Sequence, residues 1–127
     1  MKKILLYLWQ LPQNLLGLAV IFFSKASIGT WVKDIYFTKH HFGVSLGNYI
    51  ILSVNCDVMD IKHETGHQKQ SLYLGWLYLP LIGLPSACGN IWDRLFHKKW
   101  YYTARIRWYY KQPWEAWADK LGGVKRW

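Results

Sequence analysis

Acidic residues are scarce in this 127-residue chain, where seven Asp and Glu stand against sixteen Lys and Arg and the formal net charge is +9. Cysteine is scarce as well, since the chain has two and they form no CxxC pair, so no disulfide scaffold is expected. Internal repeats and low-complexity segments are missing. The composition is 52% hydrophobic and 18% aromatic, which excludes a disordered chain, a collagen and a coiled coil. This length predicts a single domain over residues 1–127.

Charge is missing altogether from two windows, residues 4–24 and 70–92. The charges that remain are unevenly spread, because residues 93–127 carry nine Lys and Arg against three acids. A basic end of this kind indicates anionic lipid or nucleic acid as a neighbour.

Residues 4–23 hold fifteen apolar residues in twenty, close to the number of about twenty that a helix needs to cross a bilayer. Polar residues and Pro12 interrupt the centre of this run. We therefore predict a broken N-terminal apolar helix that spans or dips into the membrane, with a buried core helix as the alternative. Glycine and proline also interrupt the second charge-free window, which predicts a bent apolar segment over residues 75–92.

The remaining segments predict an α+β fold. β-favouring residues at 30–32, 35–38 and 44–53, with a turn at 39–43, predict strands within residues 26–53 that form a hairpin or a small antiparallel sheet. A helix over residues 57–74 can be capped by Asn55 or Asp57. A short helix over residues 113–121 begins at Pro113 and ends at a pair of glycines.

The strongest chemical signal is the HExxH motif from His63 to His67 on the predicted helix over residues 57–74. Four-residue spacing places both imidazoles on one helical face, where they can share one Zn²⁺. Glu64 leans to the side of that face and could act as a general base on a water that the metal activates. The alternative is a pair of surface histidines. The opposite face of the helix is expected to supply the packing stripe, formed by Val58, Ile61, Thr65 and Leu72.

A catalytic zinc takes three protein ligands and keeps one position open. The acids downstream of the motif are Asp93, Glu115 and Asp119, and the last two share one face of the helix over residues 113–121. We predict that Glu115 binds the metal and that Asp119 accepts the N–H of a ligating imidazole. The alternative is a solvated acidic face. Weaker ligand candidates are His40, His41, Asp57 and Asp60.

HExxH followed by ExxxD resembles the gluzincin zinc metallopeptidases, of which the thermolysin-like enzymes are familiar members. The resemblance implies that His63, His67 and Glu115 hold zinc, that Glu64 is the base and that Asp119 supports a histidine. It also implies that a sheet precedes the active-site helix and binds an extended peptide at its edge strand, a role that residues 44–53 match. Candidates for stabilising the transition state, by chemistry alone, are Tyr101, Tyr102, Tyr109, Tyr110 and Arg105.

The longer strings HETGHQKQSLYLGWLYLPLIGLPS and PWEAWADKLGGVKR resemble short bacterial membrane-associated proteins. The shared patterns are HExGHxxQS, LGxLYL, GxPS and ExxADxxGGV. This resemblance covers about residues 4–17 and 44–126, and it implies no particular substrate.

Whether the two charge-free windows cross the membrane decides on which side of it the parts of the site lie. If each window crossed the bilayer once, the motif histidines and Glu115 would lie on opposite sides and could not share a metal. We therefore expect both windows to dip without crossing, with the site on the cytoplasmic face. The basic and aromatic segment from Arg94 to Lys111 is expected to meet lipid headgroups, and nucleic acid is the less favoured partner.

The function predicted from the sequence is that of a membrane-associated zinc metallopeptidase, in which Glu64 takes a proton from the water that attacks a peptide carbonyl. One alternative is a small membrane protein in which zinc pins the helix over residues 57–74 to the helix over residues 113–121 without catalysis. Another is a basic-aromatic module that binds lipid or nucleic acid. Glu64 separates the first two hypotheses, because only a catalyst needs its carboxylate.

Overall fold

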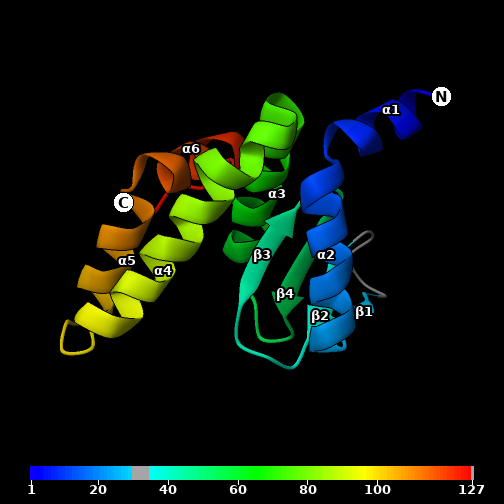
Figure 1. Cartoon of the computed structure of the whole chain (residues 1–127). Coiled ribbons are helices and arrows are strands. Elements are labelled where there is room, and N and C mark those ends of the chain that lie inside the picture. The colour runs from blue at the N-terminus through cyan, green and yellow to red at the C-terminus, as the bar shows by residue number, and fades with distance from the viewer. Residues whose placement is uncertain (30–34, 127) are drawn as a thin grey trace.

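The computed structural model describes residues 1–29 and 35–126, and the strand expected at residues 30–32 lies outside this part of the chain. The described residues form an α+β fold in which helices lie on both sides of a four-stranded mixed sheet (Figure 1).

Two helices at the N-terminus form the broken apolar element that was expected. Helix α1 (Lys2–Trp9) and helix α2 (Leu11–Ser24) meet at Gln10 with a bend of 82°. Pro12 lies in the first turn of α2, where a missing N–H costs nothing. No single helix in the described residues has the length and apolar composition to cross a membrane. Helices α1 and α2 have that length and composition only when they are taken together as a bent pair.

The sheet contains β1 (Ser27–Ile28), β2 (Ile35–Thr38), β3 (Gly43–Leu46) and β4 (Tyr49–Ser53), in the spatial order β1-β2-β4-β3. The expected antiparallel pairing is present between β1 and β2 and in the β3–β4 hairpin, but the sheet as a whole is mixed, because β2 and β4 pair in parallel. The segment over residues 44–53, expected as one strand, folds back on itself at Gly47, whose φ of +65° suits a tight turn. This hairpin leaves β3 at the edge of the sheet and places β4 beside β2.

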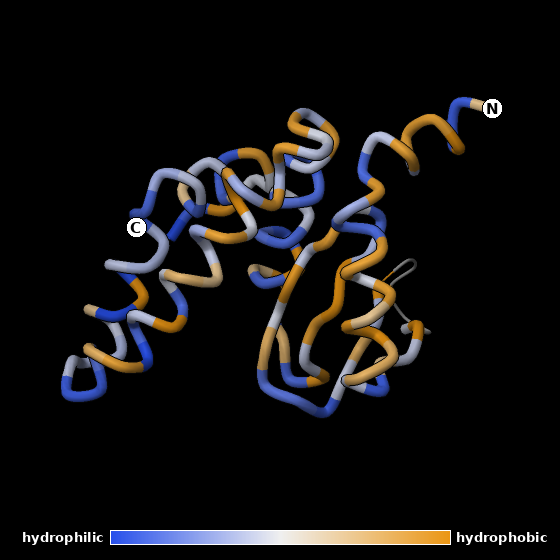
Figure 2. Tube along the Cα trace, viewed as in Figure 1, coloured by the Kyte–Doolittle hydropathy of each residue, from blue (hydrophilic) through white to orange (hydrophobic). Residues whose placement is uncertain are grey.

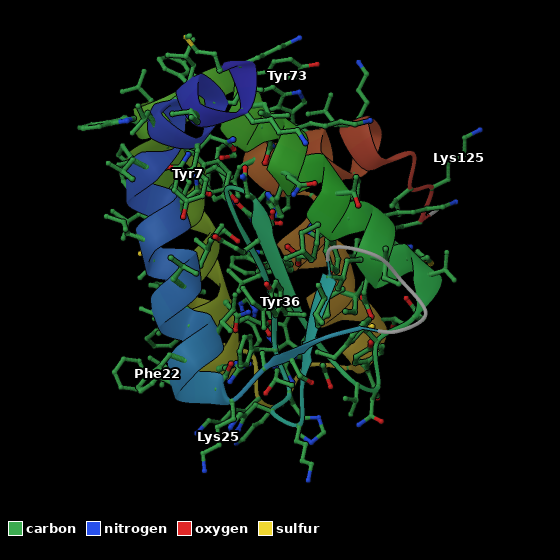
Figure 3. All side chains as sticks on the ribbon, turned by 90° about the vertical axis from the view of Figure 1, so that its right-hand side faces the viewer. Tyr7, Phe22, Lys25, Tyr36, Tyr73 and Lys125 are labelled. Carbon is green, nitrogen blue, oxygen red and sulfur yellow. The ribbon has the colours of Figure 1, made fainter. Side chains whose placement is uncertain are left out.

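Helix α3 (Val58–Leu74) carries the HExxH motif and packs on the face of the sheet opposite to α2, as the side view shows (Figure 3). It begins at Asp57 with a reciprocal cap, in which the Asp57 and Asp60 carboxylates each accept the other residue's backbone N–H. Buried Ile50 and Leu52 of β4 form a small apolar core that Ile61 of α3 adjoins. The sheet therefore fixes the position of the motif helix.

The chain turns back after α3, and α4 then runs beside α5 (Figure 1). Gly75, with φ of +56°, ends α3 against the ring of Trp9. A 3₁₀ turn, η1 (Gly75–Leu77), and a π-helical turn, η2 (Leu79–Gly83), then lead into α4 (Leu84–Phe96). The bend expected over residues 75–92 is thus confined to residues 75–83. Helices α5 (Tyr102–Tyr110) and α6 (Pro113–Gly122) complete the fold.

Candidate metal centre

Helix α6 packs directly against α3, and two glycines allow the backbones to meet. A Cβ atom added at Gly66 would overlap the carbonyl oxygen of Ala118, and one added at Gly122 would overlap the carbonyl oxygen of Lys62. Any side chain at these positions would push the helices apart. The close approach brings Glu115 of α6 onto the face of α3 that carries the motif histidines.

His63, His67 and Glu115 form a buried cluster that could hold a metal ion, since one ligand atom from each lies within 4.8 Å of the other two. The Nε2 atoms of both imidazoles lie 3.0 Å from the same oxygen, Glu115 Oε2. Their side chains are almost inaccessible to solvent. The structure therefore brings together the three residues that the sequence singled out as ligands.

The other ring nitrogen of each histidine is held by its own acceptor. His63 Nδ1 lies 2.7 Å from Asp119 Oδ1, and His67 Nδ1 lies 2.7 Å from Gln70 Oε1. When both Nδ1 atoms donate their hydrogens to these oxygens, a neutral ring presents its Nε2 lone pair to Glu115. The three convergent atoms then all act as acceptors, which is the arrangement that a cation satisfies.

Without a metal ion, protons on the imidazole rings must satisfy the acceptor atoms that converge in the cluster. Burial disfavours a charged His63, but hydrogen bonds to Asp119 and Glu115 outweigh it and raise the pKa of His63 to about 9. The pKa of His67 is raised in the same way, with the Glu115 hydrogen bond opposing the effect of burial. Burial alone would raise the pKa of Glu115, yet the bonds from the two imidazoles hold it well below its usual range. The site therefore contains a carboxylate that stays charged and, on either side of it, two imidazole rings that can each bind a proton or a metal ion.

A further layer of contacts fixes these partners. Arg126 donates to Asp119 from Nε at 2.7 Å, and its guanidinium lies 3.4 Å from the centre of the Tyr110 ring. The Tyr110 ring in turn packs edge-on against His63. On the other side, Gln70 Nε2 donates to the carbonyl oxygen of Trp114 at 2.9 Å. His63 is thus oriented directly by Asp119 of α6, and His67 is oriented by Gln70 of α3, which α6 holds in place through the Trp114 carbonyl.

Glu64 lies beside the cluster, at the wall of a cavity of about 640 Å³. It is almost fully buried, and its Oε2 atom has no hydrogen-bond partner among the described residues. Burial raises the pKa of Glu64, and the adjacent imidazoles oppose this rise when they are charged. A buried carboxylate oxygen without a partner has a place for a water or a substrate group. The cavity is also lined by His41 and Phe42 from the β2–β3 turn, Gly43 from β3, Asn90 and Arg94 from α4, and Tyr102, Tyr109 and Tyr110 from α5.

The weaker ligand candidates do not join the cluster. Asp57 and Asp60 cap α3, and His40 stacks against Phe42 in the turn after β2. His41 lines the cavity but is not part of the buried group.

The candidates for stabilising a transition state separate into two groups. Tyr102, Tyr109 and Tyr110 line the cavity beside Glu64. Arg105 instead pairs with Asp93 at 2.7 Å, and Tyr101 is 86% exposed and is not among the residues that line the cavity. Three of the five candidates therefore remain close to the proposed chemistry.

One expectation about α3 was wrong, because the histidine face is the buried one. Val58 and Leu72, expected on the packing face, are exposed, whereas Gly66 and Gln70 are buried beside the histidines. The reason is that α6 covers this face and satisfies its polar groups. Gly66, Gln70 and Arg126 carry no motif that assigns them a role from the sequence alone. A glycine between the two motif histidines was the available signal for a close helix contact.

In comparisons with known proteins, the chain matches no family model, no curated protein and no solved structure.

Proposed function

We propose that this chain is a membrane-associated zinc peptidase. The observation that carries the proposal is the convergence of His63 Nε2, His67 Nε2 and Glu115 Oε2, with both Nδ1 atoms already bound by acceptors. Two imidazoles and one carboxylate are a ligand set of catalytic zinc, which leaves one position open. Tetrahedral ligands at about 2.0 Å from zinc lie about 3.3 Å apart. This is close to the 3.0 Å that separates each Nε2 from Glu115 Oε2.

A zinc ion held by His63, His67 and Glu115 would supply a water of lowered pKa, towards about 7, and would polarise a carbonyl group. Glu64 then takes the proton of the attacking water and delivers it to the leaving amine. Its raised pKa suits this double role, because a base that never holds a proton cannot return it. Tyr102 and Tyr110 line the cavity and are the candidates for orienting the substrate carbonyl, whereas the Tyr109 hydroxyl is already bonded to Ser86.

A peptide substrate is supported by the position of β3. This strand is at the edge of the sheet, and its first residue, Gly43, lies next to the Glu64 carboxylate. An extended peptide that pairs with a sheet edge gains backbone hydrogen bonds. Such a peptide would pass the cavity in which Glu64 lies. The cavity volume of about 640 Å³ is also ample for a few residues.

The test of this proposal is Glu64→Gln, assayed for bound metal and for hydrolysis of a mixed library of internally quenched peptides. The variant should keep its zinc and lose hydrolysis by at least about a hundredfold, because the amide cannot accept the proton. Asp60→Asn is the matched control, since it also changes a cavity-lining acid of α3 to its amide, and it should retain activity.

Equal activity of the wild type and Glu64→Gln would contradict the peptidase proposal. With zinc retained in both, that result would support the alternative in which the metal only pins α3 to α6. The same experiment therefore distinguishes the two functions.

Membrane association and a cytoplasmic site are part of the proposal. The support within the segment from Arg94 to Lys111 is a group of exposed aromatic and basic residues at the turn between α4 and α5, namely Lys98, Lys99, Trp100, Tyr101 and Tyr102. Such residues suit a lipid headgroup layer. Labelling of single cysteines placed in residues 25–69 and 95–127 should report one side of the membrane for both segments. Labelling from opposite sides would contradict Glu115 as a ligand.

A further inference from the structure

Helices α2 and α4 have an unusual distribution of polar and apolar side chains. In α2 the buried residues are Gln13, Asn14 and Gly17, whereas Phe22 is 77% exposed. In α4 no residue is buried, and Leu84 is 61% exposed. In water an amphipathic helix turns its apolar stripe inward. These two helices do the opposite.

The polar side chains of α2 are buried because they find partners inside the protein. Gln13 Nε2 donates to Ser71 Oγ and to the carbonyl oxygen of Gly75, both at 2.8 Å. Asn14 Oδ1 accepts the backbone N–H of Asn48 at 2.7 Å, and its amide donates to Tyr7. These bonds fix the rotation of α2 about its axis, and the apolar stripe consequently faces outward.

The two outward stripes lie on the same side of the molecule. Figure 1 places α2 and α4 in front of α3, and Figure 3, turned by 90°, again places both helices on the side away from α3, with Phe22 pointing outward. Apolar residues follow α2 and recur along α4 in Figure 2. We name this surface the α2–α4 face and define it by six exposed residues: Leu15, Leu18, Phe22, Leu84, Ile91 and Leu95.

The charges near the α2–α4 face are of one sign. Helix α2 contains no acid, and the single acid of α4, Asp93, is paired with Arg105 and His97. Exposed Lys25 follows α2, and exposed Lys98 and Lys99 follow α4. An apolar surface bordered by lysines, without an unpaired carboxylate, is complementary to hydrocarbon below anionic headgroups.

We infer that the α2–α4 face docks this chain into one leaflet of an anionic lipid bilayer. With 14 residues α2 is about 21 Å long, and α4 with 13 residues is shorter, whereas the hydrocarbon core is about 30 Å thick. The face therefore lies in one leaflet. This inference rests on the membrane association proposed above and names the surface responsible; it is argued from burial and charge and does not depend on the metal centre or on the peptidase activity.

Flotation of the full chain with vesicles of phosphatidylcholine and phosphatidylglycerol tests the inference. The wild type should float with the vesicles, and the double variant Leu15→Gln/Leu18→Gln should partition at least about tenfold more weakly, since two exposed leucines lose their contact with hydrocarbon. Ile91→Gln on α4 carries the same prediction and provides a second variant should the first fail to fold. Val58→Gln is the matched control, because Val58 is 66% exposed but lies on α3, and its partitioning should equal that of the wild type.

Face variants that float as well as the wild type would overturn the inference. So would a wild type that stays off the vesicles as a soluble dimer, because a second copy would then cover the face. His67→Ala should float normally, so a failure of the metal centre is distinguished from a failure of docking.

Discussion

Two regions of this molecule differ in the kind of side chain that they bury and expose. The contact between α3 and α6 buries ionisable and amide side chains, among them His63, Glu115 and Gln70. The α2–α4 face exposes leucine, isoleucine and phenylalanine. Buried polar groups are tolerated when each has a partner, and exposed apolar stripes are tolerated when the surroundings are apolar. This contrast is what supports both proposals, a cation bound at the first region and lipid at the second.

Helix α4 contributes residues both to the cavity beside the α3–α6 contact and to the α2–α4 face. Asn90 and Arg94 line the cavity beside Glu64, while Ile91 and Leu95 are exposed on the α2–α4 face. The helix therefore separates the candidate site from the proposed bilayer surface. Changes in the two regions should have separable effects, and the following predictions test that separation.

The largest effect is expected from Gly66→Ala. The added methyl group would overlap the backbone of Ala118 at the closest point between α3 and α6. The free energy of unfolding should fall by more than about 2 kcal/mol, and metal binding should be lost with it.

Gly89→Ala on α4 is the matched control, because the nearest atom to its Cβ would lie 3.9 Å away. It should leave stability unchanged or raise it by up to about 1 kcal/mol, as alanine favours a helix. Thermal denaturation followed by circular dichroism measures both variants. Equal stability of the two would refute the close contact between α3 and α6.

Asp119→Asn should weaken metal binding without unfolding the chain. The carboxylate orients His63 and favours its binding through Nε2, and loss of such a partner lowers metal affinity about 10- to 100-fold. Titration against a chelator of known affinity measures the change. Asp93→Asn is the control, since Asp93 also bonds a histidine and an arginine but lies outside the cluster, and it should leave the affinity unaltered.

Metal affinity should rise with pH, whereas docking to vesicles should not change. The pKa of His63 is about 9 in the metal-free chain, so below that pH a metal must displace a proton. Affinity should therefore increase by at least about tenfold per pH unit between about pH 6 and 8, and more steeply where His67 also gives up a proton.

The metal-free chain should show the opposite trend in stability. The charged His63 stabilises the folded state below its unfolded pKa of about 6.5, and this contribution is lost as pH rises through about 9. Chelator titrations and urea denaturation at several pH values test both trends. A metal affinity that is independent of pH would contradict protonated histidines in the metal-free cluster.

The parts of the site that local periodicity determines could be predicted from the sequence. The spacing of His63 and His67, and of Glu115 and Asp119, places each pair on one helical face whatever the rest of the fold does. The scarcity of acids left three acidic candidates for the third ligand downstream of the motif, besides the weaker candidates upstream of it. The helix over residues 57–74 and its capping residue Asp57 also follow from local signals.

The parts that depend on long-range packing could not be predicted. The parallel pairing of β2 with β4 depends on a turn at Gly47 that Asn14 of α2 stabilises from a distant part of the chain. Helical spacing places Gln70 on the face of His63 and His67, but its role as the acceptor for His67 follows only from the structure, where Trp114 of α6 holds its amide. The burial of the histidine face likewise follows from the position of α6.

The central claim is that His63, His67 and Glu115 bind a zinc ion. Elemental analysis of the wild type and His67→Ala, both purified after growth with added zinc, tests it most directly. We predict about one zinc ion per wild-type chain and a loss of most of it in the variant. A wild type without zinc, or a variant that binds as much as the wild type, would contradict the account.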